Sequence, residues 1–501
     1  AKPSLTTTYG TGFASSIAIG DLSGDGTVEL VAPGLNGRLY VYRGDGQDAG
    51  NGTPILWTSD LVGPAAEPAL ADLDDDGKAE IILSGKNGAF AFRHDGSLLW
   101  QNPAVVSYYP NEALGWGGPT VGNLDLDPAP EVVVAASDDA LYVLDSQGSV
   151  VFSDTIGRWA TVPVLADITG DGMLDIVVAQ GWTLKVYDYF NGGQIAWSYT
   201  LTETINVLGG AGVFGAPAVA DLNEDGRPEI IINWGHIVDA FQDDGTLLWR
   251  YRTNANNLFR PSAITVADVD GDGEMNVVTA SAVSGGFVIF NHLLMVLDAT
   301  GARLWDQLVA DNTASASGVA AQDLTGDGIW DILWNGANDG FLVIRGADGK
   351  RLFNEPVTGS GTVLDYPTLG DVDGDGYAEV VVAGREGLFV IGHDELWADS
   401  RPLWNQHNYH ITNINDDWST PAAEQNSWEF YNTYRTQTPN RTPAPSYQIA
   451  FTYTAGAPGV TVLTPTATIS LTAAPPLYTW DYRQERNQPV VTRSEERRVG
   501  K

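Results

Sequence analysis

Hydrophobic residues along the chain fall into short runs separated by turns rich in Gly, Asp and Asn. One kind of run is β-branched and uninterrupted, as in EIILSG (80–85) and EVVVAA (131–136). A second kind alternates apolar and polar positions and ends in a turn, as in LYVYRGDG (39–46) and FLVIRGADG (341–349). Runs of this length predict β-strands, and no period of 3.6 residues that would indicate helices lies between them. The pattern therefore predicts an all-β protein.

An acidic segment precedes each β-branched run, and the whole pattern repeats. Asp21 and Asp371 start the first and last segments and are 350 residues apart, so the seven intervals average about 50 residues. Each repeat holds four short runs, the last of which ends on an aromatic residue. Four antiparallel strands at such a period are typical of a β-propeller blade. Eight sets favour an eight-bladed propeller, with seven blades as the alternative. The eight acidic segments are DLSGDGTVE (21–29), DLDDDGKAE (72–80), NLDLDPAPE (123–131), DITGDGMLD (167–175), DLNEDGRPE (221–229), DVDGDGEMN (268–276), DLTGDGIWD (323–331) and DVDGDGYAE (371–379). The aromatic residues are Trp57, Trp100, Phe152, Trp197, Trp249, Trp305, Phe353 and Trp397.

These segments, which we call the acidic loops, have the composition of a calcium site. Positions 1, 3, 5 and 9 carry side-chain oxygens, position 7 can offer its carbonyl, and position 6 is Gly in seven of the eight loops. Oxygen ligands in a flexible loop suit a hard cation, and six or seven of them suit Ca²⁺ better than Mg²⁺. The alternative is that Asp and Gly serve only tight Asx turns. An EF-hand is excluded because it needs helices and a Glu at position 12, where the last loop has Val382 in a predicted strand.

The acidic loops predict up to eight Ca²⁺ sites of unequal strength. Loop 123–131 has Asn123 at position 1 and Pro128 in place of Gly, so it binds by another turn geometry or not at all. Loop 268–276 ends in Asn276, whereas loops 72–80 and 371–379 have carboxylates at all four of positions 1, 3, 5 and 9 and are expected to bind most tightly. The candidate metal ligands are Asp21, Ser23, Asp25, Thr27, Glu29, Asp72, Asp74, Asp76, Lys78, Glu80, Asn123, Asp125, Asp127, Glu131, Asp167, Thr169, Asp171, Met173, Asp175, Asp221, Asn223, Asp225, Arg227, Glu229, Asp268, Asp270, Asp272, Glu274, Asn276, Asp323, Thr325, Asp327, Ile329, Asp331, Asp371, Asp373, Asp375, Tyr377 and Glu379.

The repeated pattern AxxDxDGxxE followed by VVVAG resembles the FG-GAP or VCBS repeats of integrin-α-like propellers, over about residues 13 to 400. The resemblance implies Ca²⁺ between the first and second strands of each blade. It also implies a secreted or cell-surface protein used in adhesion or recognition, although some members are domains of enzymes. In integrins these loops lie on the face away from the ligand.

Charge and composition exclude several kinds of partner and of functional site. The formal net charge of −37 argues against nucleic acid or an anionic membrane as a partner. Absence of cysteine removes disulfides, thiolate metal sites and a cysteine nucleophile. The longest apolar run, FVIFNHLLMVL (287–297), is too short to span a bilayer.

A ligand is expected on the face opposite the acidic loops. In a four-strand meander the turns after strands one and three share one face, and the longer links between blades lie on the other. Long loops on a rigid scaffold usually carry binding. The links are 101–118, 198–216, 250–262 and 354–367. The candidate contacts for an extracellular protein or glycan are Tyr108, Tyr109, Trp116, Phe214, Phe259, Arg260 and Tyr366. The alternative is that these side chains pack within and between blades.

Catalytic motifs are sparse. The segment WNQHNYHITNINDD (404–417) holds His407 and His410, but residues three apart in a strand point to opposite faces, which argues against a shared metal. The repeated Gly-x-x-Leu-Trp element resembles the tryptophan-docking motif of quinone-dependent dehydrogenases. Packing of each Trp between blades is the simpler interpretation.

Four segments are expected along the chain. Residues 1–437 form the propeller, with 401–437 breaking the period and either completing the last blade or plugging the rim. Residues 438–446 are a Thr/Pro-rich linker. Residues 447–492 are the truncated start of a second β domain, and 493–501 resemble a translated sequencing adaptor. The function expected is that of a secreted or cell-surface calcium-binding recognition or adhesion module within a larger protein, not an enzyme. The alternatives are a polysaccharide-active enzyme similar to rhamnogalacturonan lyases and a structural spacer.

Overall fold

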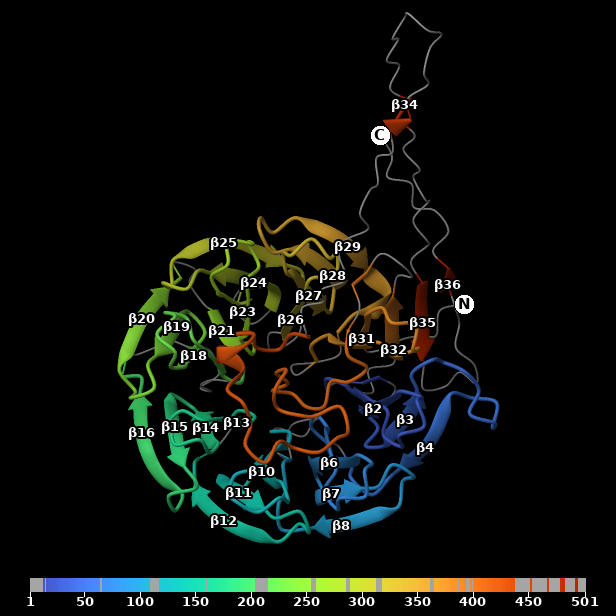
Figure 1. Cartoon of the computed structure of the whole chain (residues 1–501), viewed down its shortest axis with the longest axis vertical. Helices are drawn as coiled ribbons and strands as arrows, with labels where there is room; N and C mark the ends of the chain where they lie inside the picture. The colour runs from blue at the N-terminus through green and yellow to red at the C-terminus, as the bar shows by residue number, and fades with distance from the viewer. Residues whose placement is uncertain are drawn as a thin grey trace, which may run out of the picture.

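The computed structural model describes residues 12–13, 15–63, 65–108, 117–157, 160–202, 215–253, 258–284, 289–311, 318–360, 365–384, 387–392, 397–398, 400–437 and four short strands beyond them. Eight small antiparallel sheets form a ring, which confirms the predicted eight-bladed β-propeller (Figure 1). Among the described residues, no helix has the length and apolarity that a membrane crossing requires.

Each blade is a meander that runs outward from the centre of the ring. The first four blades are β1 (Ala18–Gly20), β2 (Glu29–Pro33), β3 (Leu39–Arg43) and β4 (Ile55–Ser59); β5 (Ala69–Ala71), β6 (Glu80–Gly85), β7 (Gly88–Phe92) and β8 (Leu98–Asn102); β9 (Thr120–Gly122), β10 (Glu131–Ala135), β11 (Ala140–Leu144) and β12 (Val150–Thr155); β13 (Val164–Ala166), β14 (Asp175–Gln180), β15 (Thr183–Asp188) and β16 (Gln194–Thr200).

The other four blades vary more in strand number. They are β17 (Ala218–Ala220), β18 (Glu229–Asn233), β19 (Ile237–Phe241) and β20 (Leu247–Arg252); β21 (Leu258–Pro261), β22 (Thr265–Ala267), β23 (Asn276–Ser284), β24 (Ile289–Leu297) and β25 (Arg303–Val309); β26 (Val319–Gln322), β27 (Asp331–Gly336), β28 (Gly340–Arg345) and β29 (Arg351–Glu355), followed by the 3₁₀ turn η1 (Pro356–Thr358); β30 (Thr368–Gly370), β31 (Glu379–Gly384), β32 (Gly387–Gly392), β35 (Tyr478–Tyr482) and β36 (Thr492–Arg493). A separate pair is β33 (Phe451–Thr452) and β34 (Thr466–Ala467).

Position in the blade explains the residue pattern of each strand. The innermost strands are short, as with ALA in β5 and AVA in β17, and they are fully buried because eight of them crowd around the centre. The second strands are buried on both faces between neighbouring blades, which explains their uninterrupted β-branched runs. The outermost strands lie on the circumference of the ring and alternate between exposed and half-buried residues (Figure 1).

Tryptophans within five of the outer strands bond their blade to the next one. Trp57 Nε1 donates a hydrogen bond of 2.9 Å to the carbonyl of His94, in the turn between the third and fourth strands of the next blade. Trp100 makes the equivalent bond to Ser146, also at 2.9 Å. The same contact joins Trp197 to Asp243, Trp249 to Ala299 and Trp305 to Gly346. Packing between blades, the simpler interpretation of the Gly-x-x-Leu-Trp element, is confirmed.

The eighth blade departs from the sequence-based expectation. Trp397, predicted to close its fourth strand, lies in a bend. The strand that pairs with β32 is instead β35, which falls within the range predicted as a second domain. The predicted linker (438–446) lies outside the described residues, as does the predicted tail beyond Arg493.

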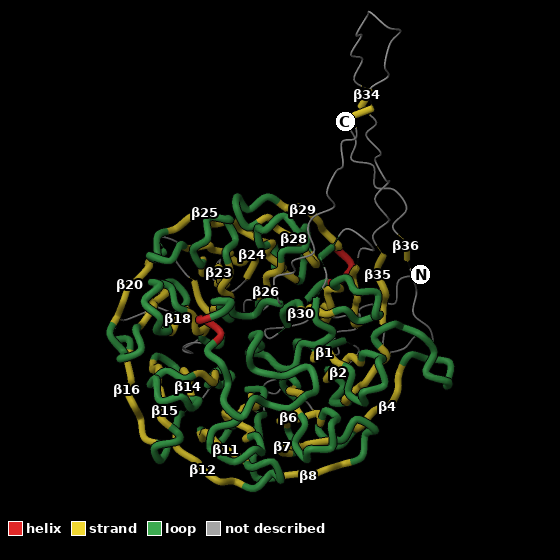
Figure 2. The backbone as a smooth tube through the Cα atoms, viewed as in Figure 1, coloured by secondary structure: helices red, strands yellow, loops and turns green. Residues whose placement is uncertain are grey.

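Residues 401–437, which we call the central segment, cross the middle of the ring and contain the 3₁₀ turn η2 (Ser427–Glu429) (Figures 1 and 2). The sequence left open whether they complete the last blade or plug the rim. The structure places them at the centre, in contact with every blade. The bonds to the blades join Trp404 to Ile19, Asn405 to Leu70, Gln406 to Val121, Asn408 to Pro163, Asn432 to Asp221, Tyr434 to Val266, Arg435 to Ala321 and Gln437 to Leu369.

Candidate metal centres

Each acidic loop connects the first strand of a blade to the second, and the strands fix its two ends. In the second blade, Asp72 follows β5 and Glu80 begins β6, where Glu80 is paired with Ala71. Both side chains are buried although they are charged and lie at the ends of a surface turn. The carboxylates at positions 1 and 9 are therefore held by the sheet itself, while positions 3 and 5 lie on the connecting turn.

Backbone N–H groups orient these carboxylates in the loop of the eighth blade. Asp371 accepts hydrogen bonds from Gly374 N at 2.8 Å and Gly376 N at 3.0 Å. Asp375 Oδ1 accepts from Tyr377 N at 2.8 Å, and Glu379 Oε2 accepts from Val372 N at 2.9 Å. Such donors fix the side chains without neutralising them. The loop therefore holds its carboxylate oxygens in fixed positions before any ion binds.

The glycine at position 6 has the backbone conformation that the turn requires. Gly376 has φ +94° and Gly77 has φ +79°, in the left-handed region that other residues rarely adopt. Each donates its N–H to the position 1 carboxylate, at 3.0 Å in the eighth blade and 2.8 Å in the second. The predicted role of this glycine is confirmed.

Carboxylates gather closely enough to hold one cation in four of the acidic loops. Asp371, Asp373, Asp375 and Glu379 each offer an oxygen within 4.8 Å of the others. The other three clusters are Asp72, Asp74 and Glu80; Asp125, Asp127 and Glu131; and Asp268, Asp270 and Asp272. These four loops are those with Asp at position 3. The remaining loops have Ser23, Thr169, Asn223 or Thr325 there, which offer a neutral oxygen.

Several oxygens of these loops have no partner in the protein. Among the described residues, Glu80 Oε1, Asp270 Oδ1 and Asp331 Oδ2 are buried without a hydrogen-bond donor. A buried carboxylate oxygen that lacks a donor is costly unless a cation or water satisfies it. Burial raises the pKa of Glu80 to about 8 and that of Asp331 to about 8. The donor set is all oxygen, anionic and turned inward, so it fits Ca²⁺.

Loop 123–131, with Pro128 at position 6, forms a different turn from the other loops. Pro128 has no N–H to donate, and Asn123 Nδ2 instead donates to the carbonyl of Asp127 at 2.7 Å. Glu131 Oε2 still accepts from Leu124 N at 2.8 Å, as in the other loops. Because Asp125, Asp127 and Glu131 converge, this loop keeps three candidate ligands.

Comparison with known proteins identifies the repeat. A profile described as FG-GAP-like repeat matches residues 21–83 and 167–232, which include four of the acidic loops. The chain carries FG-GAP-like repeats. Comparison with curated protein sequences gives no match.

Two solved structures share the propeller fold of this chain. The V. cholerae biofilm matrix protein Bap1 has a TM-score of 0.61 at 16% identity, over 88% of this chain and 98% of that chain. The Saccharomyces cerevisiae protein Sqt1 has a TM-score of 0.52 at 12% identity, over 79% of this chain and 97% of that chain. At these identities the likeness is one of fold.

The two faces of the propeller carry different loops. Arg93, in the turn between β7 and β8, donates to Asp74 in the acidic loop of the same blade at 3.1 Å. The β7–β8 turn and the acidic loop therefore share one face. On the other face, Lys86 is in the β6–β7 turn and Tyr108 is in a blade-to-blade link. The Nζ atom of Lys86 lies 5.5 Å from the ring centre of Tyr108.

The candidate ligand contacts are only partly described. Tyr108 is half-buried. The sequence predicts Tyr366 as a surface contact, but its side chain is 2% exposed and its hydroxyl donates to the carbonyl of His407 at 2.7 Å. Tyr109, Trp116 and Phe214 lie outside the described residues, as do the side chains of Phe259 and Arg260 in β21.

His407 and His410 have different partners, one outside the central segment and one within it. His407 Nδ1 lies 3.3 Å from Glu67 Oε1, whereas His410 Nε2 contacts Glu424 at 2.5 Å. Both side chains are 5% exposed. The structure therefore gives each histidine its own carboxylate and does not direct them to one metal.

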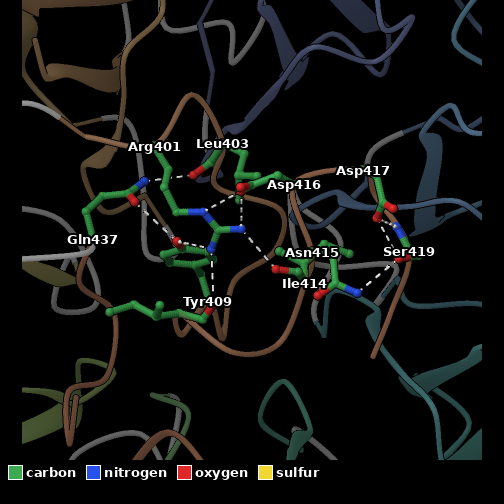
Figure 3. Close-up of polar contacts among 10 residues, drawn as sticks. Arg401, Leu403, Tyr409, Ile414, Asn415, Asp416, Asp417, Ser419 and Gln437 are labelled. Carbon is green, nitrogen blue, oxygen red and sulfur yellow. Dashed lines mark hydrogen bonds and ion pairs between the residues drawn. The ribbon is translucent and has the colours of Figure 1, made fainter. Parts of the chain in front are cut away.

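Sequence reasoning missed the contacts that hold the central segment. Figure 3 shows the Arg401 guanidinium donating to Asp416 at 2.7 Å, to the hydroxyl of Tyr409 at 3.2 Å and to the carbonyl of Ile414 at 3.0 Å. Gln437 Nε2 donates to the carbonyl of Leu403 at 2.7 Å. The only sequence signal was the density of Asn, Trp and Tyr in this segment, which does not specify partners.

Proposed function

We propose that this chain is a secreted or cell-surface propeller that binds Ca²⁺ in its acidic loops and acts as a recognition or adhesion module. The observation that carries the proposal is the convergence of Asp371, Asp373, Asp375 and Glu379 within 4.8 Å. Two carboxylates about 4 Å apart repel by roughly 4 kcal/mol at an effective dielectric of 20. A cation among four of them converts this repulsion into attraction.

The overall charge supports a calcium-rich environment. The chain carries 63 acidic and 26 basic residues, and eight Ca²⁺ ions would change its formal charge from −37 to about −21. Sensor-type loops bind at roughly 10⁻⁷–10⁻⁵ M and extracellular modules at roughly 10⁻⁴–10⁻³ M. Weak sites of the second kind fill only outside the cell, which favours secretion or surface display.

A recognition role rests on the scaffold and on one relative. Bap1, whose fold this chain shares over most of its length, is a biofilm matrix protein. Rigid blades that present long links on the face opposite the acidic loops form a platform for a protein or glycan ligand. His407 and His410, the one pair of histidines close together in the sequence, each pair with a carboxylate inside the protein. We therefore propose a binding role without catalysis.

A glycan array and a panel of matrix proteins test the role. Labelled protein is applied in millimolar Ca²⁺ and, in parallel, after removal of Ca²⁺ with a chelator. The proposal predicts binding to a defined set of ligands that weakens in chelator. Absence of binding to every ligand contradicts recognition, and release of unsaturated products from pectic polymers would establish a lyase instead.

A further inference from the structure

The central segment is bonded directly to the first residue of several acidic loops. In the part of the chain that the structure describes, these residues are Asp21, Asp72, Asp221 and Asp371, from the first, second, fifth and eighth blades. Each supplies a position 1 carboxylate to its loop. The central segment, which holds none of the candidate ligands, is thus attached to four acidic loops, and in two of them, 72–80 and 371–379, the carboxylates converge.

Trp418 bridges the loops of the first two blades. Its Nε1 donates to the carbonyl of Asp21 at 2.7 Å, and its own carbonyl accepts from Asp72 N at 3.0 Å. The indole lies against Gly20, where a Cβ atom would be 1.9 Å from the ring. Only glycine leaves room for this ring. The position of Trp418 is therefore tied to the backbone of both loops.

Asn432 forms a reciprocal pair with the loop of the fifth blade. Asp221 N donates to Asn432 Oδ1 at 2.8 Å, and Asn432 Nδ2 donates to the carbonyl of Asp221 at 2.6 Å. In the eighth blade, Asp371 N donates to the carbonyl of Arg401 at 3.3 Å. The two ends and the middle of the central segment are all attached in this way.

We infer that Trp418 and Asn432 are positioning residues that couple Ca²⁺ binding in the acidic loops to the seating of the central segment. This inference rests on the proposed binding of Ca²⁺. An ion that fixes the Asp221 carboxylate also fixes the backbone atoms to which Asn432 bonds. By linkage, a seated segment must raise the affinity of the loop for Ca²⁺ by the same factor as Ca²⁺ favours seating.

The coupling has a consequence for the middle of the ring. The central segment covers main-chain atoms of the innermost strands at Ile19, Leu70 and Val266. Loss of Ca²⁺ weakens the attachments at both ends of the segment and exposes these strands. Access to the centre of the propeller is thereby controlled by the metal.

Hydrogen exchange measured by mass spectrometry tests the coupling on the full chain. Amide protection is followed across free Ca²⁺ concentrations in two regions, the loop 221–229 and the central segment. We expect the two to gain protection over the same Ca²⁺ range. Asn432→Gly removes the side-chain pair and tolerates the φ of +51° found there. We expect it to raise the half-saturating Ca²⁺ concentration of loop 221–229 by roughly fivefold or more.

Two further variants keep the result interpretable. Trp418→Phe removes the N–H that donates to Asp21, together with part of the ring that packs on Gly20, and keeps the carbonyl that accepts from Asp72 N. Loop 21–29 is therefore expected to lose Ca²⁺ affinity while loop 167–175 does not. Phe430→Ala, at a side chain 59% exposed in the same segment, is expected to change neither loop. Protection of the central segment that is independent of Ca²⁺, while the loops respond, overturns the coupling alone. Loops that do not respond to Ca²⁺ overturn the proposed function as well.

Discussion

The indole ring of Trp100 covers Gly148 so closely that a Cβ atom on the glycine would lie 2.6 Å from the ring. Gly148 also has φ +79°. Both features recur at three other blade boundaries, where Gly96, Gly245 and Gly301 lie beneath Trp57, Trp197 and Trp249. The ring is thus built from one contact used repeatedly, and the contact allows no side chain on the turn.

Replacement of this glycine is expected to destabilise the propeller. Gly148→Ala combines left-handed strain with overpacking against Trp100, at a cost of roughly 2 to 4 kcal/mol. Gly181→Ala is the matched control, because its φ is +58° and nothing lies within 4 Å of its Cβ. The control should lose only about 1 kcal/mol. Equal losses in thermal unfolding of the two variants would contradict the packing argument.

Removal of charge from one acidic loop should affect stability only when Ca²⁺ is present. The double variant Asp373→Asn, Asp375→Asn keeps oxygens that accept from Asp375 N and Tyr377 N. It should lower the Tm in millimolar Ca²⁺ by several degrees and leave the Tm of metal-free protein nearly unchanged. Asp48→Ala, which removes the acceptor of a turn outside the loops, should lower both values alike. Calorimetry of the four samples distinguishes the two patterns.

The glycine at position 6 should matter to the metal as well as to the turn. Gly376→Ala strains a backbone with φ +94° and moves the N–H that orients Asp371. We expect Ca²⁺ affinity at this loop to fall at least tenfold, in addition to about 1 kcal/mol of stability. Gly192→Ala has similar strain, with φ +100° and open space around it, and should leave Ca²⁺ binding unchanged. Isothermal titration provides the comparison.

The stability of the metal-free protein should fall as the pH rises. Burial raises the pKa of Glu80 from 4.5 to about 8, and that of Glu29 and Glu131 also to about 8. The folded chain therefore retains protons that the unfolded chain releases between pH 4.5 and 8, and its stability declines across this window. Saturating Ca²⁺ should flatten the dependence, because the ion replaces the protons. A metal-free Tm that rises with pH, or a Glu80→Gln variant with an unchanged pH slope, would refute this assignment.

The sequence predicted the features that each repeat determines locally. Strand alternation, the position 6 glycines and an aromatic residue in the outer strand of the first seven blades recur with the period of the blades, so the pattern in one blade supports the interpretation of the next. The central segment has no such period. Its bonds join residues more than 200 positions apart, as in the pair Asn432 and Asp221, and no local pattern specifies them. Tyr366 was misassigned for the same reason, because its burial depends on His407 in that segment.

The number of Ca²⁺ ions retained per chain tests the central claim most directly. Metal-free protein is dialysed to equilibrium against millimolar Ca²⁺, and bound metal is counted by mass spectrometry alongside the Tm. Four loops with converging carboxylates, and up to eight acidic loops in all, predict between four and eight ions per chain and a higher Tm. A chain that retains no Ca²⁺ under these conditions, with an unchanged Tm, would contradict the account.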